Sequence, residues 1–202
     1  MRSALYLGRR RQGKSTLAFH HALQQKGGIV VFDINAQFRD CPGVRTSDLA
    51  EFDTLVSNSQ ERIVIFRPAR NVNEEFGAFC ECLWKRQGYT LLIDEASQVQ
   101  SAAGCNEWLD RFMRMAPPEL KIFQTLHRPR DSATLCRSLA TDWFIFRTTL
   151  PRDLDVIEEQ CGEEARVRVA GFEEGSRVFY HWDDSLGKGE IIDHPESWKE
   201  VI

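Results

Sequence analysis

The stretch that most constrains this chain is Gly8-Arg-Arg-Arg-Gln-Gly13-Lys14-Ser15-Thr16, which follows an apolar run and precedes a helical pattern. Glycines at both ends let the backbone N–H groups of a loop converge on an anion. The positive end of the following helix and the ammonium of Lys14 add to that attraction. Strand, glycine loop and helix in this order predict a loop that binds nucleotide phosphates. The expected nucleotide-binding residues are Gly8, Arg9, Arg10, Arg11, Gln12, Gly13, Lys14, Ser15 and Thr16.

A second stretch, Tyr89-Thr-Leu-Leu-Ile-Asp94-Glu95, is an apolar run that delivers two adjacent carboxylates. By itself this pattern also fits a strand that ends in an acidic turn. With a phosphate loop upstream, the two carboxylates predict divided roles: Asp94 and the Ser15 hydroxyl hold Mg²⁺, and Glu95 polarises a water that attacks the γ-phosphate. We therefore expect ATP and Mg²⁺ as the ligands of this chain.

Buried strands alternate with helical patterns along most of the chain, which predicts an α/β fold with a mainly parallel central sheet flanked by helices. An additional strand lies between the loop strand and the acidic strand in sequence. It can be inserted between these two strands in the sheet, as a RecA-like (ASCE) P-loop NTPase with a catalytic glutamate requires. The expected strands cover residues 4–7, 29–32, 62–66, 89–93, 120–126 and 142–147.

The C-terminal part is expected to be strand-like, with residues 166–170 and 176–181 forming a C-terminal β-hairpin after a helix within 149–161. We expect one P-loop ATPase domain over residues 1–186 and a loosely ordered tail over 187–202. Asp33 and Asn35 end the second strand, where they can be either ligands at the edge of the sheet or ordinary turn residues.

Composition excludes several classes of function. The net charge is -4, so non-specific binding of nucleic acid through overall charge is not expected, and any DNA contact must be local. The six cysteines lack the paired spacing of a zinc site and indicate a reduced, cytoplasmic protein. No signal peptide and no apolar run of membrane-spanning length is evident, so we expect a protein of the host cytoplasm, associated with a virion if it is viral.

The motifs together resemble the FtsK/HerA superfamily of P-loop ATPases, which are ring motors that pump double-stranded DNA. GRRRQGKST is similar to the family's phosphate loop, VVFDINAQF to its second strand and LLIDEAS to its acidic strand. The most discriminating piece is LKIFQTLHRPRDSATLCRSLATDWFIFRT, because a family strand ends in Gln-Arg-Pro and a helix and a strand follow. GFEEGSRVFYHW is similar to a family hairpin. Without accessory domains, the chain resembles the minimal genome-packaging ATPases of viruses and phages.

The resemblance implies further catalytic residues. His127 takes the position of the family's sensing residue, which is usually glutamine, and Gln124 lies three residues earlier. Histidine can also hydrogen-bond a γ-phosphate, but its charge varies near neutral pH. A trans-acting arginine is expected just before that strand, where Arg114 is the nearest match and Arg111 the alternative.

The resemblance also implies partners: double-stranded DNA in the pore of a homo-oligomeric ring of five or six copies, and a capsid or membrane protein that docks the motor. Arg128 and Arg130 are candidate DNA contacts. Two alternatives stay open. One is a phage assembly or conjugation-type ATPase that acts on a protein or membrane partner. The other is a P-loop kinase. Glu95 argues against a kinase, because a base that activates water would promote hydrolysis where water must be excluded.

Overall fold

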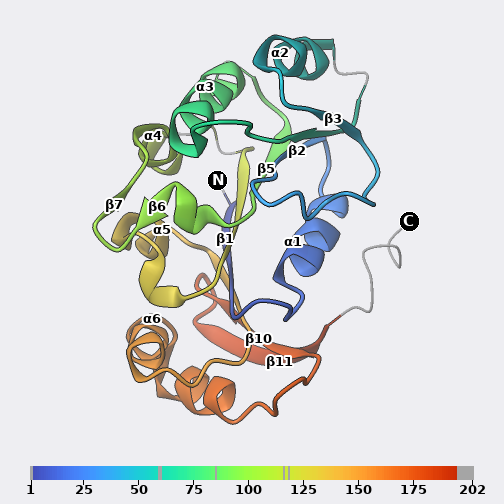
Figure 1. Ribbon diagram of the computed structural model, residues 1–202. Coiled ribbons are helices and arrows are strands. Elements are labelled where there is room, and N and C mark those ends of the chain that lie inside the picture. The colour runs from blue at the N-terminus through green and yellow to red at the C-terminus, as the bar shows by residue number, and fades with distance from the viewer. Residues whose placement is uncertain (1, 59–60, 85, 116, 118, 195–202) are drawn as a thin grey trace.

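A computed structural model describes residues 2–58, 61–84, 86–115, 117 and 119–194 of the chain. Its centre is a sheet with the strand order β11-β10-β9-β1-β8-β5-β2-β4-β3 (Figure 1). These strands are β1 (Arg2–Leu7), β2 (Gly28–Phe32), β3 (Val44–Thr46), β4 (Ile63–Phe66), β5 (Tyr89–Ile93), β8 (Lys121–Leu126), β9 (Asp142–Ile145), β10 (Val178–Asp183) and β11 (Lys188–Asp193). The strands from β9 to β3 are parallel, whereas β10 and β11 form an antiparallel hairpin at one edge.

The strand between the loop strand β1 and the acidic strand β5 is β8. The sequence predicts such an insertion, but from a strand that precedes the acidic strand in the chain. β8 instead follows β5 in the chain. Neighbouring strands lie about 4.8 Å apart, so the insertion separates the ends of β1 and β5 by about 10 Å and leaves room for a phosphate between them.

Figure 1 shows α1 on one face of the sheet and α3, α4, α5 and α6 on the other. The helices are α1 (Lys14–Leu23), α2 (Leu49–Asn58), α3 (Val72–Trp84), α4 (Glu107–Met115), α5 (Thr134–Ser138) and α6 (Pro151–Ala170). Short elements, not expected from the sequence, follow the acidic strand and β8: η1 (Ala96–Gln98), β6 (Gln100–Ser101), β7 (Gly104–Cys105) and η2 (Pro129–Asp131). Each face of the sheet therefore has its own apolar core.

The prediction for residues 166–170 was wrong, because this segment is the end of α6 and not a strand. Ala165 and Val169 are buried four residues apart on one side of the helix, whereas Val167 is 63% exposed. An alternation of apolar and charged residues over so short a segment does not separate a strand from a helix. Gly162, with φ of 85°, bends α6 in its middle.

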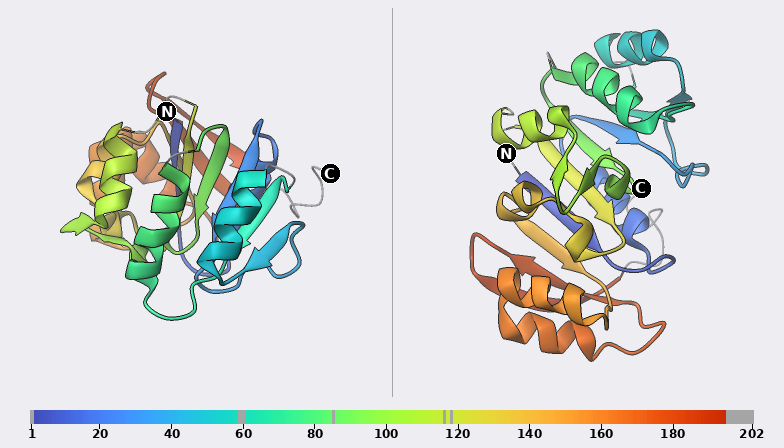
Figure 2. Two further views of the ribbon diagram at one scale, coloured as in Figure 1. Left: turned by 90° about the horizontal axis from the view of Figure 1, so that it is seen from above. Right: turned by 60° about the vertical axis from the view of Figure 1, so that its left-hand side comes forward.

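The C-terminal hairpin exists, but its strands are β10 and β11. The tail expected from residue 187 therefore still belongs to the sheet through Asp193, and the predicted boundary at 186 falls in the turn of the hairpin. Residues 195–202 lie outside the described residues. Figure 2 shows the C-terminal elements, in orange and red, at one end of the sheet and α2 with β3, in cyan, at the other.

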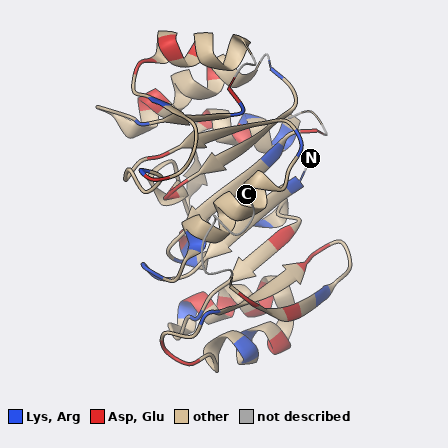
Figure 3. Ribbon diagram, turned by 90° about the vertical axis from the view of Figure 1, so that its right-hand side faces the viewer, with Lys and Arg blue, Asp and Glu red and all other residues tan. Residues whose placement is uncertain are grey.

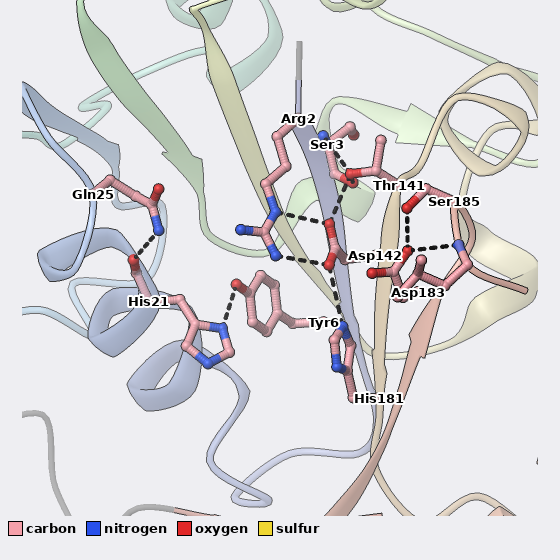
Figure 4. Close-up of polar contacts among 11 residues, drawn as sticks. Arg2, Ser3, Tyr6, His21, Gln25, Thr141, Asp142, His181, Asp183 and Ser185 are labelled. Carbon is pink, nitrogen blue, oxygen red and sulfur yellow. Dashed lines mark hydrogen bonds and ion pairs between the residues drawn. The ribbon is translucent and has the colours of Figure 1, made fainter. Parts of the chain in front are cut away.

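A group of polar side chains, the amino-end cluster, fastens the start of β1 to its neighbours: Arg2, Tyr6, His21, Asp142 and His181 (Figure 4). The Arg2 guanidinium donates to both carboxylate oxygens of Asp142 at 2.8 and 2.9 Å, and His181 Nε2 lies 3.1 Å from the same carboxylate. The buried Tyr6 hydroxyl lies 3.0 Å from His21 Nδ1. Burial lowers the pKa of His21 to about 3, so its neutral ring accepts the tyrosine proton. The cluster thus joins α1, β1, β9 and β10.

Among the described residues, none of the helices combines the length and the apolar character needed to cross a membrane.

Candidate nucleotide-binding site

The loop between β1 and α1 has the backbone of an anion-binding turn. Gly13 precedes α1 with φ of 92° and ψ of 9°, a left-handed conformation that favours glycine. Gly8 needs to be glycine for space as well, because a Cβ there would lie 2.6 Å from Phe146 Cβ. Arg11 is also left-handed, with φ of 64°. The loop thus directs the N-terminus of α1 towards the carboxyl ends of the strands.

Lys14 is buried at the first position of α1, and its ammonium already has partners. Nζ donates to Arg9 O at 2.9 Å and lies 3.4 Å from His127 Nδ1. Burial lowers the pKa of Lys14 to about 8, although Glu95 and Asp94 oppose this shift. A phosphate in the loop would supply the negative charge that the buried ammonium lacks.

Asp94 is the most constrained carboxylate of the site. Its Oδ1 accepts hydrogen bonds from Ser15 Oγ at 2.7 Å and from Thr125 Oγ1 at 2.9 Å, whereas its buried Oδ2 has no partner. Burial raises the pKa of Asp94 to about 6 despite these two hydrogen bonds. A carboxylate oxygen without a partner beside a serine hydroxyl fits a Mg²⁺ site, since oxygen ligands are those that Mg²⁺ prefers.

Glu95 and His127 meet at the mouth of the site, where Glu95 Oε1 lies 2.7 Å from His127 Nε2. Glu95 has φ of 52° and ψ of 49°, a strained conformation for a non-glycine residue, and its N–H donates to Thr125 Oγ1 at 3.0 Å. Burial, followed by the Lys14 ammonium, lowers the pKa of His127, while Glu95 opposes the shift. Nδ1 of a neutral His127 can accept from Lys14, whereas the buried Nε2 lies within ion-pair distance of Glu95 without forming a hydrogen bond.

Of these groups, Lys14, Ser15 and Glu95 border a cleft of about 590 Å³. Its lining residues are Arg10, Arg11, Gly13, Lys14, Ser15, Thr16, Asn35, Gln37 and Glu95. Of the two polar residues that end β2, Asn35 thus faces the cleft, whereas Asp33 is buried. The Asp33 carboxylate accepts from the backbone N–H groups of Gln37 and Phe38 and from Arg67 Nε at 3.1 Å, so it supports the turn.

Two residues of the predicted loop have partners outside the cleft. Gln12 Nε2 donates to Arg147 O at 3.1 Å, and its Oε1 accepts from Arg9 N. The Arg9 guanidinium donates to Thr149 Oγ1 at 3.2 Å. Arg9 and Gln12 therefore join the loop to the segment after β9.

The two candidates for a trans-acting arginine lie on α4, away from the lining of the cleft. Arg114 is exposed and forms an ion pair with Asp110 one helical turn away, at 2.9 Å. The Arg111 guanidinium lies over the rings of Trp84 and Trp108, at 4.3 and 5.0 Å from their centroids. Both arginines are exposed, and the trans role of either stays a prediction.

Three other candidate residues lie on β8 or directly after it, and they differ in exposure. Gln124 is fully buried and donates towards Met113, so it does not reach the cleft. Arg128 is exposed after His127, and Arg130 lies in η2, 3.9 Å from Asp131. Their contact with DNA stays a prediction.

Three residues that contact the site were missed from the sequence: Thr125, Gln37 and His194. Thr125 looked like an ordinary strand residue, and Gln37 follows the turn after β2. His194 Nε2 lies 2.9 Å from Gly13 O, so the end of the hairpin packs on the phosphate loop.

Comparison with known proteins shows the fold. No protein-family model matches the chain, and no curated protein does. The genome packaging NTPase B204 of Sulfolobus turreted icosahedral virus 2, solved with AMPPCP, superposes with a TM-score of 0.80 at 19% identity, covering 96% of this chain and 97% of that one.

Two further solved structures are similar. VirB4 of Thermoanaerobacter pseudethanolicus has a TM-score of 0.65 at 8% identity and covers 100% of this chain and 91% of its own. The N-terminal domain of zonular occludens toxin from Neisseria meningitidis has a TM-score of 0.53 at 12% identity, with coverages of 98% and 97%. The RecA-like P-loop NTPase fold expected from the motifs is thereby confirmed.

Proposed function

We propose that this protein is an ATP-hydrolysing motor that translocates double-stranded DNA, as a subunit of a viral or phage genome-packaging ring. The observation that carries the proposal is the chain of contacts from Lys14 through His127 to Glu95, beside the Asp94–Ser15 pair, next to a cleft that Lys14, Ser15 and Glu95 line. The match to a genome packaging NTPase over nearly the whole chain supports the packaging role.

In this proposal the loop amides and Lys14 hold the β- and γ-phosphates, and Ser15 and Asp94 hold Mg²⁺, which neutralises phosphate charge when bound. Glu95 accepts the proton of the attacking water, and electrostatic stabilisation by Lys14 supplies much of the remaining rate. His127 contacts both Lys14 and Glu95, so a γ-phosphate that engages Lys14 also changes the surroundings of the base. This arrangement supports His127 as the sensing residue.

Charge distribution supports local contact with DNA. Residues 151–193 contain five Lys and Arg and twelve Asp and Glu, so this part of the chain is strongly acidic. Figure 3 marks the positions of Asp and Glu in red along the ribbon of the lowest elements, α6 with β10 and β11. DNA phosphates would be repelled there, and because Arg128 and Arg130 lie beside Asp153 of α6, a contact with DNA through them would be confined to their exposed ends.

The test is the ATPase rate with and without double-stranded DNA, together with the mass of the assembled species. Stimulation by DNA in an assembly of five or six copies supports the proposal. Mixing Arg114→Ala with Lys14→Ala subunits tests the ring contact: partial recovery of activity places Arg114 in trans, and no recovery at any ratio, with rings still forming, removes it.

A second candidate is an assembly or conjugation-type ATPase that acts on a protein or membrane partner. The matches to VirB4 and to the zonular occludens toxin domain favour it. An ATPase rate that does not respond to DNA would favour this candidate over the translocase. Phosphate transferred to an added acceptor, in place of free phosphate, would favour a kinase.

A further inference from the structure

The side-chain amide of Gln100, at the start of β6, is a buried junction between two loops of the site. Its Nε2 donates to Gln124 Oε1 at 2.6 Å. Its Oε1 accepts from the backbone N–H of Ala133 at 2.9 Å and from Ser132 Oγ at 3.3 Å. All four residues are at most 5% exposed, so water does not compete for these hydrogen bonds.

The hydrogen-bonded residues of the junction follow two residues of the site at the same spacing: Gln100 is five positions after Glu95, and Ser132 is five positions after His127. Glu95 is followed by the single turn η1 and then by Gln100. His127 is followed by the single turn η2 and then by Ser132. Both turns are closed by backbone hydrogen bonds, which stiffen the segments 95–100 and 127–132. The two segments contact each other at both ends. At the first, the Glu95 and His127 side chains are 2.7 Å apart. At the second, the Gln100 amide accepts hydrogen bonds from Ser132 and Ala133.

We propose that Gln100 is a positioning residue for hydrolysis, which holds the Glu95 loop and the His127 loop at a fixed separation; this inference rests on the ATPase function proposed above. Glu95 occupies a strained left-handed conformation, and strain of this kind persists only where the surroundings enforce it. Thr125 holds the Glu95 backbone from β8, and Gln100 anchors the far end of the same loop. None of the three Gln100 hydrogen bonds involves the phosphate loop, so its effect falls on turnover and not on nucleotide binding.

The test uses Gln100→Met, which keeps most of the side-chain volume and removes all three hydrogen bonds. We expect kcat to fall about 10- to 100-fold, as for a catalytic group displaced by about 1 Å. The affinity for a fluorescent ADP analogue should stay within about twofold, because Lys14 and the loop amides are untouched. Met113→Leu is the matched control: it changes the packing beside Gln124 and leaves the Gln100 bonds in place, so kcat should be retained.

Hydrogen exchange of the full-length chain provides a readout that needs no hydrolysis. In Gln100→Met the Ala133 and Glu95 amides should both exchange faster, while the Leu17 amide in α1 is unchanged. Faster exchange at Ala133 alone, with Glu95 protection and kcat retained, would overturn the proposal. An inactive wild-type chain would instead reject the ATPase function, and exchange would still decide whether Gln100 couples the loops. If Gln100→Met does not fold, Gln124→Met removes the 2.6 Å bond from the other side and should shift both readouts in the same direction.

Discussion

A buried aspartate lies near each end of β1, and the two aspartates differ in their hydrogen bonding and in the direction of their pKa shift. At the carboxyl end, Asp94 is buried with one oxygen unpartnered, and burial raises its pKa to about 6. At the amino end, burial would also raise the pKa of Asp142, but hydrogen bonds from His181, Arg2 and Thr141 outweigh it and hold that pKa well below its ordinary value. Burial of a carboxylate therefore does not mark a functional site. An unpartnered oxygen does not mark one by itself either, since Asp153 of α6 also has one; Asp94 is distinguished by the Ser15 hydroxyl and the phosphate loop beside it.

The largest expected difference between the two ends is in turnover. Glu95→Gln should lower kcat by about 10² to 10⁴, because the amide cannot accept the proton of water, while nucleotide affinity is retained. Asp142→Asn, an equivalent change in the amino-end cluster, should leave kcat of the folded protein within about twofold. Steady-state rates and nucleotide titration of both variants check this, and substantial turnover in Glu95→Gln would show that Glu95 is not the base.

Replacing the buried aspartate by asparagine should change the free energy of unfolding in opposite directions at Asp94 and at Asp142. In the absence of metal and nucleotide at pH 7.5, we expect Asp94→Asn to raise the free energy of unfolding by about 1 to 3 kcal/mol, because it removes a buried, incompletely bonded charge. Asp142→Asn should lower it by about 1 to 3 kcal/mol, because Arg2 and His181 lose an ionised acceptor. Denaturant unfolding measures both, and changes of the same sign would contradict the contrast between the ends.

The pH dependence of stability follows from the raised pKa of Asp94. The folded state binds the Asp94 proton more tightly than the unfolded state, whose pKa is about 4, so metal-free wild-type protein gains stability as the pH falls through about 6. Asp94→Asn lacks this gain. The advantage of Asp94→Asn should therefore shrink by about 1 to 2 kcal/mol between pH 7.5 and pH 5. Unfolding curves at the two pH values check this, and a constant difference would mean that Asp94 is ionised throughout.

The smallest effect is expected in the amino-end cluster. Tyr6→Phe removes the hydroxyl that lies 3.0 Å from His21 and should lower stability by about 0.5 to 1.5 kcal/mol. The ring keeps its stacking on Phe144, at 4.7 Å between centroids, so the core stays filled. Turnover should be unchanged. A loss of activity without a loss of stability would give this cluster a functional role and would remove the contrast.

The sequence predicted what depends on local pattern. The loop around Gly8 to Thr16 and the strand that ends in Asp94 and Glu95 are continuous segments, so their type and order could be inferred without the fold. The sheet and its flanking helices followed from alternating buried strands and helical patterns. The end of α6 could not be inferred, because Arg166 to Ala170 alternates like a strand and only its packing decides.

What the sequence could not show depends on contacts between distant segments. The position of β8 is set by its pairing with β1 and β5, and nothing in its composition indicates it. Thr125 serves Asp94 and Glu95 only because of that pairing, and a threonine in a strand is ordinary. The Gln100 amide is equally hidden, since its partners lie at least 24 positions farther along the chain.

The position of β1 also determines when the site can form during synthesis. Both hydrogen-bonded neighbours of β1 come from the second half of the chain: Arg2 lies beside Lys121, and Ala4 beside Asp142. A ribosome therefore releases the phosphate loop long before the strands that support it, and closing such distant contacts is slow. A nucleotide that binds this loop would therefore stabilise the completed sheet and could not assist the early steps of its folding.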